Sequence, residues 1–307
     1  MPHVLGQNQY GKAETRVVRI YKDTDRHEIK DLNVSVALSG DLSDVHLTGS
    51  NAHCLPTDTT KNTCFAFAKQ YGIESAEAYG IKLARHFVDD TEPIHRSRIR
   101  IEEYFWDRIK TPDSRARFIG SDEIGHSFVR RGGEVRTTEI TYDGERVQVI
   151  SGLKDLVVLN STNSEFWGYI KDEYTTLKED YDRILATQVT ARWAFGFEGR
   201  EDEREPDWNR SYAKVRKHLL EAFAETYSYS LQQTLFAMGN RVLDNRPEVD
   251  EVRLSLPNKH HFLVDFDGFA VEGLKNDREV YHAADRPYGL IEGTVLREGA
   301  TAVIPVD

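Results

Sequence analysis

A short polar segment at the end of an alternating strand pattern carries side chains suited to proton transfer. Residues 255–261 read Ser-Leu-Pro-Asn-Lys-His-His. Histidine exchanges protons near neutral pH, and asparagine both donates and accepts hydrogen bonds. Because Pro257 lacks a backbone N–H, we expect the strand to stop pairing near Asn258. Asn258 and His260 would then face one pocket and hold a small polar reactant.

Structural roles compete with this interpretation. Asn258 and His260 at a strand end can simply satisfy backbone groups of the following loop. A metal site built from His260, His261 and Asp265 is weaker still, because adjacent residues on a strand point to opposite faces of the sheet. From these residues alone, a chemical role and a structural role both remain open.

Two predicted helix starts offer unpaired backbone N–H groups to an anion. Thr57 and Asp58 stand at the start of one, and the Leu231 N–H and the Gln232 amide lie near the first turn of another. A helix N-terminus also carries positive potential, which suits an anionic substrate. The commoner alternative is that Thr57 or Asp58 only caps its helix.

Lys12, Phe166 and Arg183 could each have either a chemical role or a structural one. A buried Lys12 would act as a base, whereas an exposed lysine would only be solvated. Arg183 offers a planar fork of donors to a flat anion, and Phe166 can stack on a flat ring. A surface ion pair and a core aromatic are the structural alternatives.

Composition excludes several classes of protein. The 307-residue chain has a formal net charge of −11, which disfavours binding to a phosphate backbone. No apolar run approaches the ~20 residues of a membrane span. The two cysteines, Cys54 and Cys64, lack CxxC spacing, so we expect reduced thiols in a cytoplasmic protein rather than a disulfide scaffold. The first residues do not resemble a signal peptide.

Hydrophobic periodicity predicts one order of elements twice: strand, strand, helix, helix, strand, strand. The turn at Asp143-Gly144 is the natural boundary, which gives domains at residues 1–143 and 144–307. Each α+β half would lay two helices on a four-stranded antiparallel sheet, and its open edges favour oligomerisation. The predicted elements are strands at 15–21 and 32–38, helices from 57 and over 75–88, strands at 99–106 and 127–142 separated by a polar loop, strands at 147–159 and 185–197, helices at 215–223 and 231–242, and strands at 252–256 and 290–296.

Separated motifs in the same order together resemble the urate oxidase (uricase) family. They are Tyr10-Gly11-Lys12 and the segments at residues 56–63, 161–168, 172–177 and 255–260. The resemblance runs from about residue 5 to about residue 298. It implies the tunnelling fold (T-fold) with two such domains per chain, and a homotetramer of stacked barrels.

The resemblance also implies a reaction. The family oxidises urate with O₂ and water to 5-hydroxyisourate and hydrogen peroxide, in purine metabolism, without a metal or organic cofactor. By this similarity Lys12 and Thr57 form a proton-relay dyad, with Lys12 as the base and His260 extending the relay.

Substrate-binding roles are implied in the same way. Arg183 and Gln232 match the pair that holds one edge of urate, and Phe166 matches the ring that stacks on it. The backbone N–H groups of Asp58 and Leu231 would complete the contacts in the plane of the ring.

Oxygen and the second subunit complete the implied site. Asn258, with Thr57, would hold O₂ or water above the purine plane. Because the family's pocket lies between subunits, one chain would supply part of the site and its neighbour the rest. The two sets are Lys12, Thr57 and Asp58 on one chain, and Phe166, Arg183, Gln232, Asn258 and His260 on the other.

Two other functions stay open at this point. A T-fold enzyme acting on a pterin would be expected to anchor the ring with a glutamate, where Gln232 stands instead. A non-catalytic purine-binding or scaffold protein would not need Lys12, Thr57 and His260 together. The insertion at residues 199–209 and the tail after Arg297 have no implied role.

Overall fold

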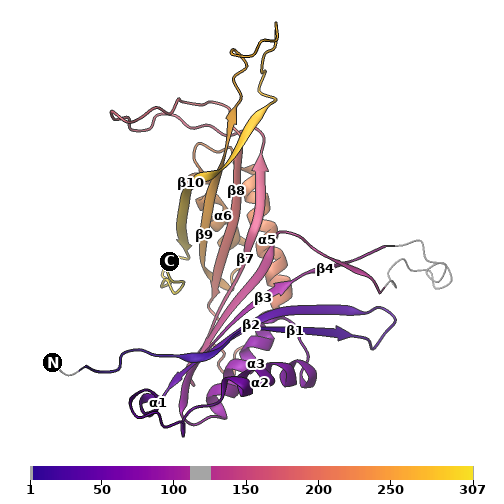
Figure 1. Cartoon of the computed structure of the whole chain (residues 1–307), viewed down its shortest axis with the longest axis vertical. Helices are drawn as coiled ribbons and strands as arrows, with labels where there is room; N and C mark the ends of the chain where they lie inside the picture. Colours follow the sequence, from indigo (N-terminus) through magenta and orange to yellow (C-terminus); the bar gives the residue numbers. More distant parts are fainter. Residues whose placement is uncertain (1–2, 111–125, 307) are drawn as a thin grey trace. The chain divides into compact units, whose positions relative to one another are not determined.

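The computed structural model describes residues 3–110 and 126–306, which fall into two compact units (Figure 1). Unit 1 comprises Met1–Gly152 and Ala194–Tyr212, and unit 2 comprises Leu153–Trp193 and Ala213–Asp307. The units interleave in sequence because β7 (Val147–Asn160) and β8 (Leu185–Phe195) each contribute residues to both. The division at residues 143 and 144 stays a prediction.

Unit 1 combines an antiparallel sheet with helices that cover one face of it. Residues of β2 alternate as expected, and Leu32, Val34, Val36 and Leu38 are all buried. Helix α2 contacts β1, and α3 contacts β3 and β6. The strands lie in the order β1 (Tyr10–Tyr21), β2 (Glu28–Gly40), β3 (Ile94–Tyr104), β6 (Val135–Tyr142), and the helices are α1 (Ser43–Leu47), α2 (Thr57–Gln70) and α3 (Ala76–Asp89).

Several boundaries in unit 1 differ from those predicted. Strand β1 begins at Tyr10 rather than residue 15, and its pairing with β2 shifts register between Lys12 and Thr15. The predicted strand at 127–142 is β5 (Phe128–Arg130) followed by β6, with Gly133 at positive φ between them. β5 pairs with β4 (Trp106–Arg108). Most of the predicted polar loop between residues 106 and 127 lies outside the described residues.

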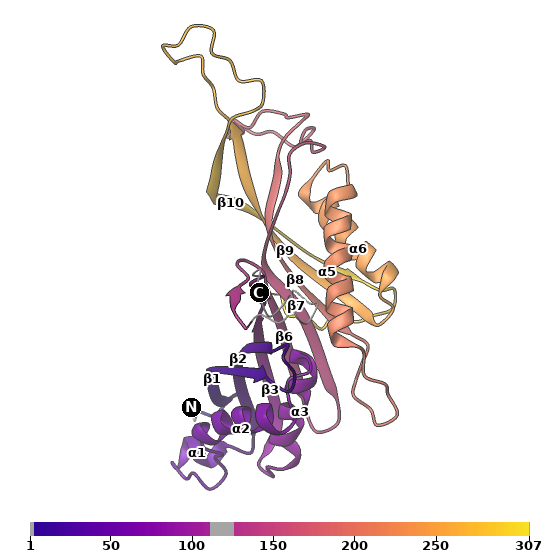
Figure 2. The same cartoon turned by 90° about the vertical axis from the view of Figure 1, so that its right-hand side faces the viewer.

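Unit 2 repeats the arrangement, with α5 beside α6 (Figure 2). Helix α6 packs closely on β9 and β10, because a Cβ at Gly239 would lie 2.5 Å from Val295 Cγ2 and one at Gly293 would lie 2.9 Å from Leu235 Cδ2. The strands lie in the order β7, β8, β9 (Val249–Leu263), β10 (Tyr281–Leu296), and the helices are α5 (Trp208–Glu225), whose first turns belong to unit 1, and α6 (Leu231–Asn245).

The prediction that β9 stops pairing near Asn258 is wrong. Pro257 pairs with Leu290, and β9 continues to Leu263 beside β10. The register shift in β10 between Ala284 and Gly289 begins only beyond Asn258, and proline in a sheet is typically found near such irregularities. Searching the described residues for membrane spans, we find no helix long and apolar enough to cross a bilayer.

Candidate active site

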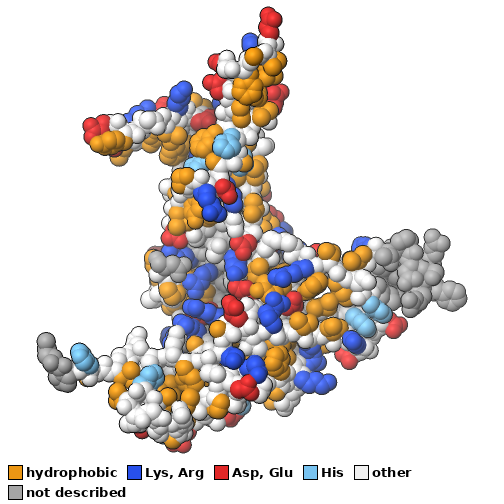
Figure 3. All heavy atoms as spheres, in the orientation of Figure 1, with side chains coloured by type: hydrophobic (Ala, Val, Ile, Leu, Met, Phe, Trp, Pro, Cys, Tyr) orange, Lys and Arg blue, Asp and Glu red, His pale blue; other side chains and the backbone are white. Residues whose placement is uncertain are grey.

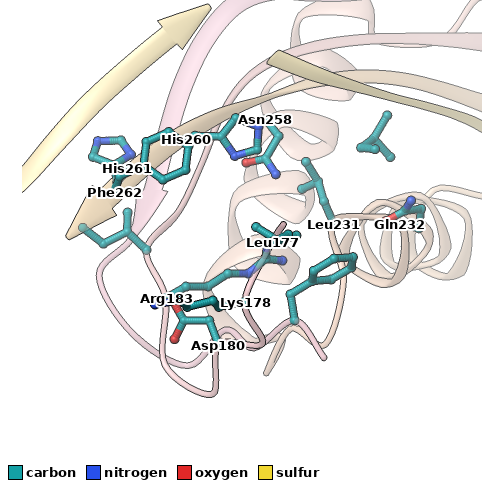
Figure 4. Close-up of a pocket in the computed structure, with 13 residues that line it drawn as sticks. Leu177, Lys178, Asp180, Arg183, Leu231, Gln232, Asn258, His260, His261 and Phe262 are labelled. Carbon is teal, nitrogen blue, oxygen red and sulfur yellow. The ribbon is translucent and has the colours of Figure 1, made fainter. Parts of the chain in front are cut away.

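A cavity of about 270 Å³ in unit 2 gathers most of the side chains selected from the sequence (Figure 4). Asn258 and His260 contribute from β9, Leu231 and Gln232 from the start of α6, and Arg183 from the segment before β8. The full lining is Phe166, Leu177, Lys178, Asp180, Arg183, Ile184, Leu231, Gln232, Asn258, His260, His261, Phe262 and Ile291.

Arg183 is held at two points by one residue. Its backbone N–H donates to the Ser164 carbonyl at 2.8 Å, and its Nε donates to the Ser164 hydroxyl at 3.1 Å. Burial lowers the pKa of Arg183, while the carboxylate of Asp180 opposes this shift. The guanidinium is therefore a partly desolvated cation, which favours an anionic ligand.

Phe166 is fixed beside this guanidinium. A reciprocal pair of backbone hydrogen bonds joins it to Asp180, with N···O distances of 2.7 and 3.0 Å. The Arg183 guanidinium carbon lies 5.1 Å from the centre of the Phe166 ring, and the Tyr169 ring stacks on Phe166 at 5.0 Å. An aromatic ring and a planar cation thus border one cavity.

The start of α6 presents an amide and backbone donors. Ser230 is the N-cap, and its hydroxyl accepts from the Gln233 N–H at 3.1 Å. The N–H groups of Leu231 and Gln232 precede those that bond within a helix. Leu231 is buried and Gln232 is exposed, so only the polar side chain of the two reaches water.

Asn258 and His260 lie two residues apart on β9 and therefore share a face. Figure 4 shows both above Arg183. Burial, the positive charge of Arg183 and the neighbouring His261 all lower the pKa of His260. Its imidazole is consequently neutral at pH 7 and able to accept a proton.

Sequence reasoning missed several lining residues. Leu177, Lys178 and Ile184 lie in the irregular segment between β7 and β8, where no periodicity marks them. His261, set aside on the sequence, also lines the cavity, and its Nδ1 lies 3.0 Å from the Lys259 carbonyl oxygen. Ile291 lies in β10 and pairs with Leu256 of β9. The strand periodicity of residues 290–296 is the sequence signal that could have identified it.

The remaining predicted residues, Lys12, Thr57 and Asp58, belong to unit 1 and do not line this cavity. Lys12 lies within β1, immediately before the register shift. A Cβ on Gly11 would lie 1.9 Å from the Val36 carbonyl oxygen, so only glycine allows this approach of β1 to β2. Bulges of this kind commonly re-aim a side chain next to an active site.

The N-terminus of α2 lacks a side-chain cap. Pro56 occupies the N-cap position, so the alternative in which Thr57 or Asp58 caps the helix is wrong. The Asp58 carboxylate instead bonds Lys61 and Asn62, and these groups, with Lys12, lower its pKa. The first N–H groups of α2 are therefore free of a capping side chain.

Comparison with known proteins places the whole chain in one family. The sequence model described as uricase matches residues 8–141 and 149–292. The chain is 47% identical to the uricase of Arthrobacter globiformis over 99% of its own length and 93% of that protein. It is 36% identical to the uricase of Dictyostelium discoideum over 95% of its length and 97% of that protein.

Solved structures agree. The crystal structure of uricase from Arthrobacter globiformis superposes with a TM-score of 0.89 at 46% identity, covering 99% of both chains. A uricase from Bacillus fastidious, at 23% identity, superposes with a TM-score of 0.79 over 96% of this chain and 95% of that one, which supports the fold. The predicted α+β tunnelling fold is confirmed, and the chain belongs to the uricase family.

Proposed function

We propose that this chain oxidises urate with O₂ and water to 5-hydroxyisourate and hydrogen peroxide, without a metal or organic cofactor. Two electrons leave urate and reduce O₂ to H₂O₂, and water supplies the hydroxyl group of the product. The proposal rests chiefly on the cavity of unit 2, where an aromatic ring, a guanidinium, an amide and a neutral histidine surround about 270 Å³. That space suits one small flat heterocycle.

In this proposal the substrate is held by its edge and its face. Arg183 and Gln232 donate hydrogen bonds to one edge of urate, and Phe166 stacks on the ring. Backbone N–H groups of Leu231 and Asp58 add contacts in the ring plane. The partly desolvated charge of Arg183 supports the choice of an anion.

Proton transfer is assigned to Lys12, Thr57 and His260, with Lys12 as the base. The neutral imidazole of His260 supports its place in the relay, because it can accept a proton and pass it on. Asn258, with Thr57, holds O₂ or water above the purine plane. Thr57 fits this role as the first residue of an uncapped helix.

We further propose that the active unit is a homotetramer in which the neighbouring subunit supplies Lys12, Thr57 and Asp58 to each pocket. β1 and β10 stand at the ends of their strand orders and expose large apolar side chains, including Val18 at 56% and Leu290 at 53%. Hydrophobic atoms also reach the surface in Figure 3. Open apolar edges favour pairing with another copy. The cytoplasmic location stays a prediction.

One assay tests the reaction. Chelator-treated protein is mixed with urate in aerated buffer, and urate absorbance and H₂O₂ are followed together. We expect urate to disappear and one H₂O₂ to form per urate consumed. An absence of turnover, or turnover only after metal is added back, would overturn the proposal.

A further inference from the structure

We propose that Ser164 is a positioning residue that fixes the guanidinium of Arg183 for purine binding. This inference rests on the proposed function, in which Arg183 holds the edge of urate. Ser164 lies outside the residues that line the cavity, and it acts through the side chain that does.

The Ser164 hydroxyl accepts a hydrogen bond from one particular donor of the guanidinium, the Nε–H group. Nε of Arg183 donates to the Ser164 hydroxyl at 3.1 Å, and the Arg183 backbone N–H donates to the Ser164 carbonyl at 2.8 Å. The remaining N–H donors are on Nη1 and Nη2, and these are the ones available to a ligand. Contacts at both ends of a long side chain restrict the rotation of the guanidinium plane.

Ser164 is itself rigidly placed. It forms a β-bridge with Ser228, flanked by hydrogen bonds from the Glu165 N–H to the Ser228 carbonyl at 2.8 Å and from the Ser228 N–H to the Asn163 carbonyl at 2.9 Å. Ser164 and Ser228 are both 0% exposed. A fully buried acceptor cannot follow the guanidinium if Arg183 moves, so it defines one position for it.

The same contacts continue into the first turn of α6. The Thr234 hydroxyl donates to the Ser228 hydroxyl at 2.8 Å, and the Ser228 hydroxyl donates to the Ser230 carbonyl at 3.0 Å. Leu231 and Gln232 follow directly. Ser164 therefore connects the two sides of the edge grip, because its backbone is bridged to Ser228, whose hydroxyl bonds into the first turn of the helix that carries Gln232.

Preorganisation explains why this matters for affinity. A free arginine side chain loses rotational freedom when it binds a ligand, and a side chain already fixed loses less. Hydrogen bonds to charged groups are stronger than those between neutral groups. Removing the Ser164 hydroxyl should therefore weaken urate binding, while the proton relay stays intact.

The test measures urate affinity in O₂-free buffer and turnover in air. We expect Ser164→Ala to raise the Kd for urate about tenfold and KM in parallel, with kcat changed by less than about twofold, as for a loss of uniform binding. Ser164→Cys keeps the side-chain size with a weaker acceptor and should give a smaller rise in Kd. This second variant maintains the test if Ser164→Ala folds poorly.

A double-mutant cycle separates positioning from general damage. Arg183→Lys keeps the charge but has no Nε donor, so adding Ser164→Ala to it should leave its Kd unchanged. Thr162→Ala is the matched control, because Thr162 bonds Asp182 at an exposed site in the same segment and its loss should not alter urate affinity.

The outcomes distinguish this inference from the proposed function. The positioning role would be overturned if Ser164→Ala left urate affinity unchanged. It would also be overturned if Ser164→Ala lowered urate affinity as much in the Arg183→Lys variant as in the unmodified protein. Either result would leave urate oxidation in place. Failure of the unmodified protein to oxidise urate would overturn the proposed function. Even then, a loss of urate affinity that Ser164→Ala causes only when Arg183 is present would support the positioning role.

Discussion

Replacing Arg136 with methionine should strongly destabilise unit 1. The Arg136 side chain is only 3% exposed and pairs with two buried carboxylates, Glu77 at 2.6 Å and Glu103 at 3.3 Å. It also donates to Asn209 Oδ1 at 2.8 Å. Methionine fills much of the volume but leaves the Glu77 carboxylate, 1% exposed, without its cation. The free energy of unfolding should therefore fall, because the substitution leaves a buried charge without its partner.

The expected magnitude follows from the partners that remain. Breaking a buried ion pair by removing one member costs about 3–5 kcal/mol. Glu103 retains Lys30 at 2.8 Å, and Glu77 retains the Ser151 hydroxyl at 2.6 Å, which favours the lower half of that range. Since domains are stable by only about 5–15 kcal/mol, even a loss of ~3 kcal/mol is easily measured.

Urea unfolding at fixed protein concentration, followed by both fluorescence and circular dichroism, measures this loss. The matched control is Arg100→Gln, because Arg100 pairs with Glu139 at 2.5 Å while its side chain is 58% exposed, and such pairs contribute about 0–1 kcal/mol. Adding Glu77→Gln to Arg136→Met should recover part of the loss. If Arg136→Met costs no more than Arg100→Gln, the reasoning from burial is wrong.

Three further outcomes are expected from the proposed chemistry. Gly11→Ala should abolish most turnover, because the added Cβ would lie 1.9 Å from a carbonyl oxygen of β2 and displace the backbone next to Lys12. Gly6→Ala is the control and should be neutral, because its Cβ would have no atom within 4 Å. Equal activities of the two variants would contradict this prediction. Lys12→Met and Thr57→Ala should each lower kcat by ~10²–10⁴-fold with little change in urate affinity in O₂-free buffer, and the reverse pattern would refute the relay. The pKa of His260 is lowered from 6.5, so its neutral form persists as pH falls through that value. The acid limb of kcat/KM should consequently lie below pH 6.5, and an acid limb at or above it would remove His260 from the relay.

The order of elements could be predicted from the sequence because it depends on local patterns. Alternation of Leu32, Val34 and Val36 reports a strand with one buried face, and the structure buries all of them. Serine is a common N-cap residue, and Ser75 stands directly before α3, where its hydroxyl accepts from the Ala78 N–H at 3.0 Å. Residues of the cavity such as Arg183 and Asn258 were predicted from their side-chain chemistry and from the family resemblance rather than from periodicity.

Tertiary structure decided what depends on partners distant in the chain. The sequence around Pro257 predicts a strand end, yet Pro257 pairs with Leu290 and β9 continues to Leu263 beside β10. Nothing near Ser164 signals its hydrogen bond to Arg183, because the two are 19 residues apart and are joined by an irregular segment. Buried polar pairs of this kind form only when the fold brings distant segments together, so local sequence patterns cannot predict them.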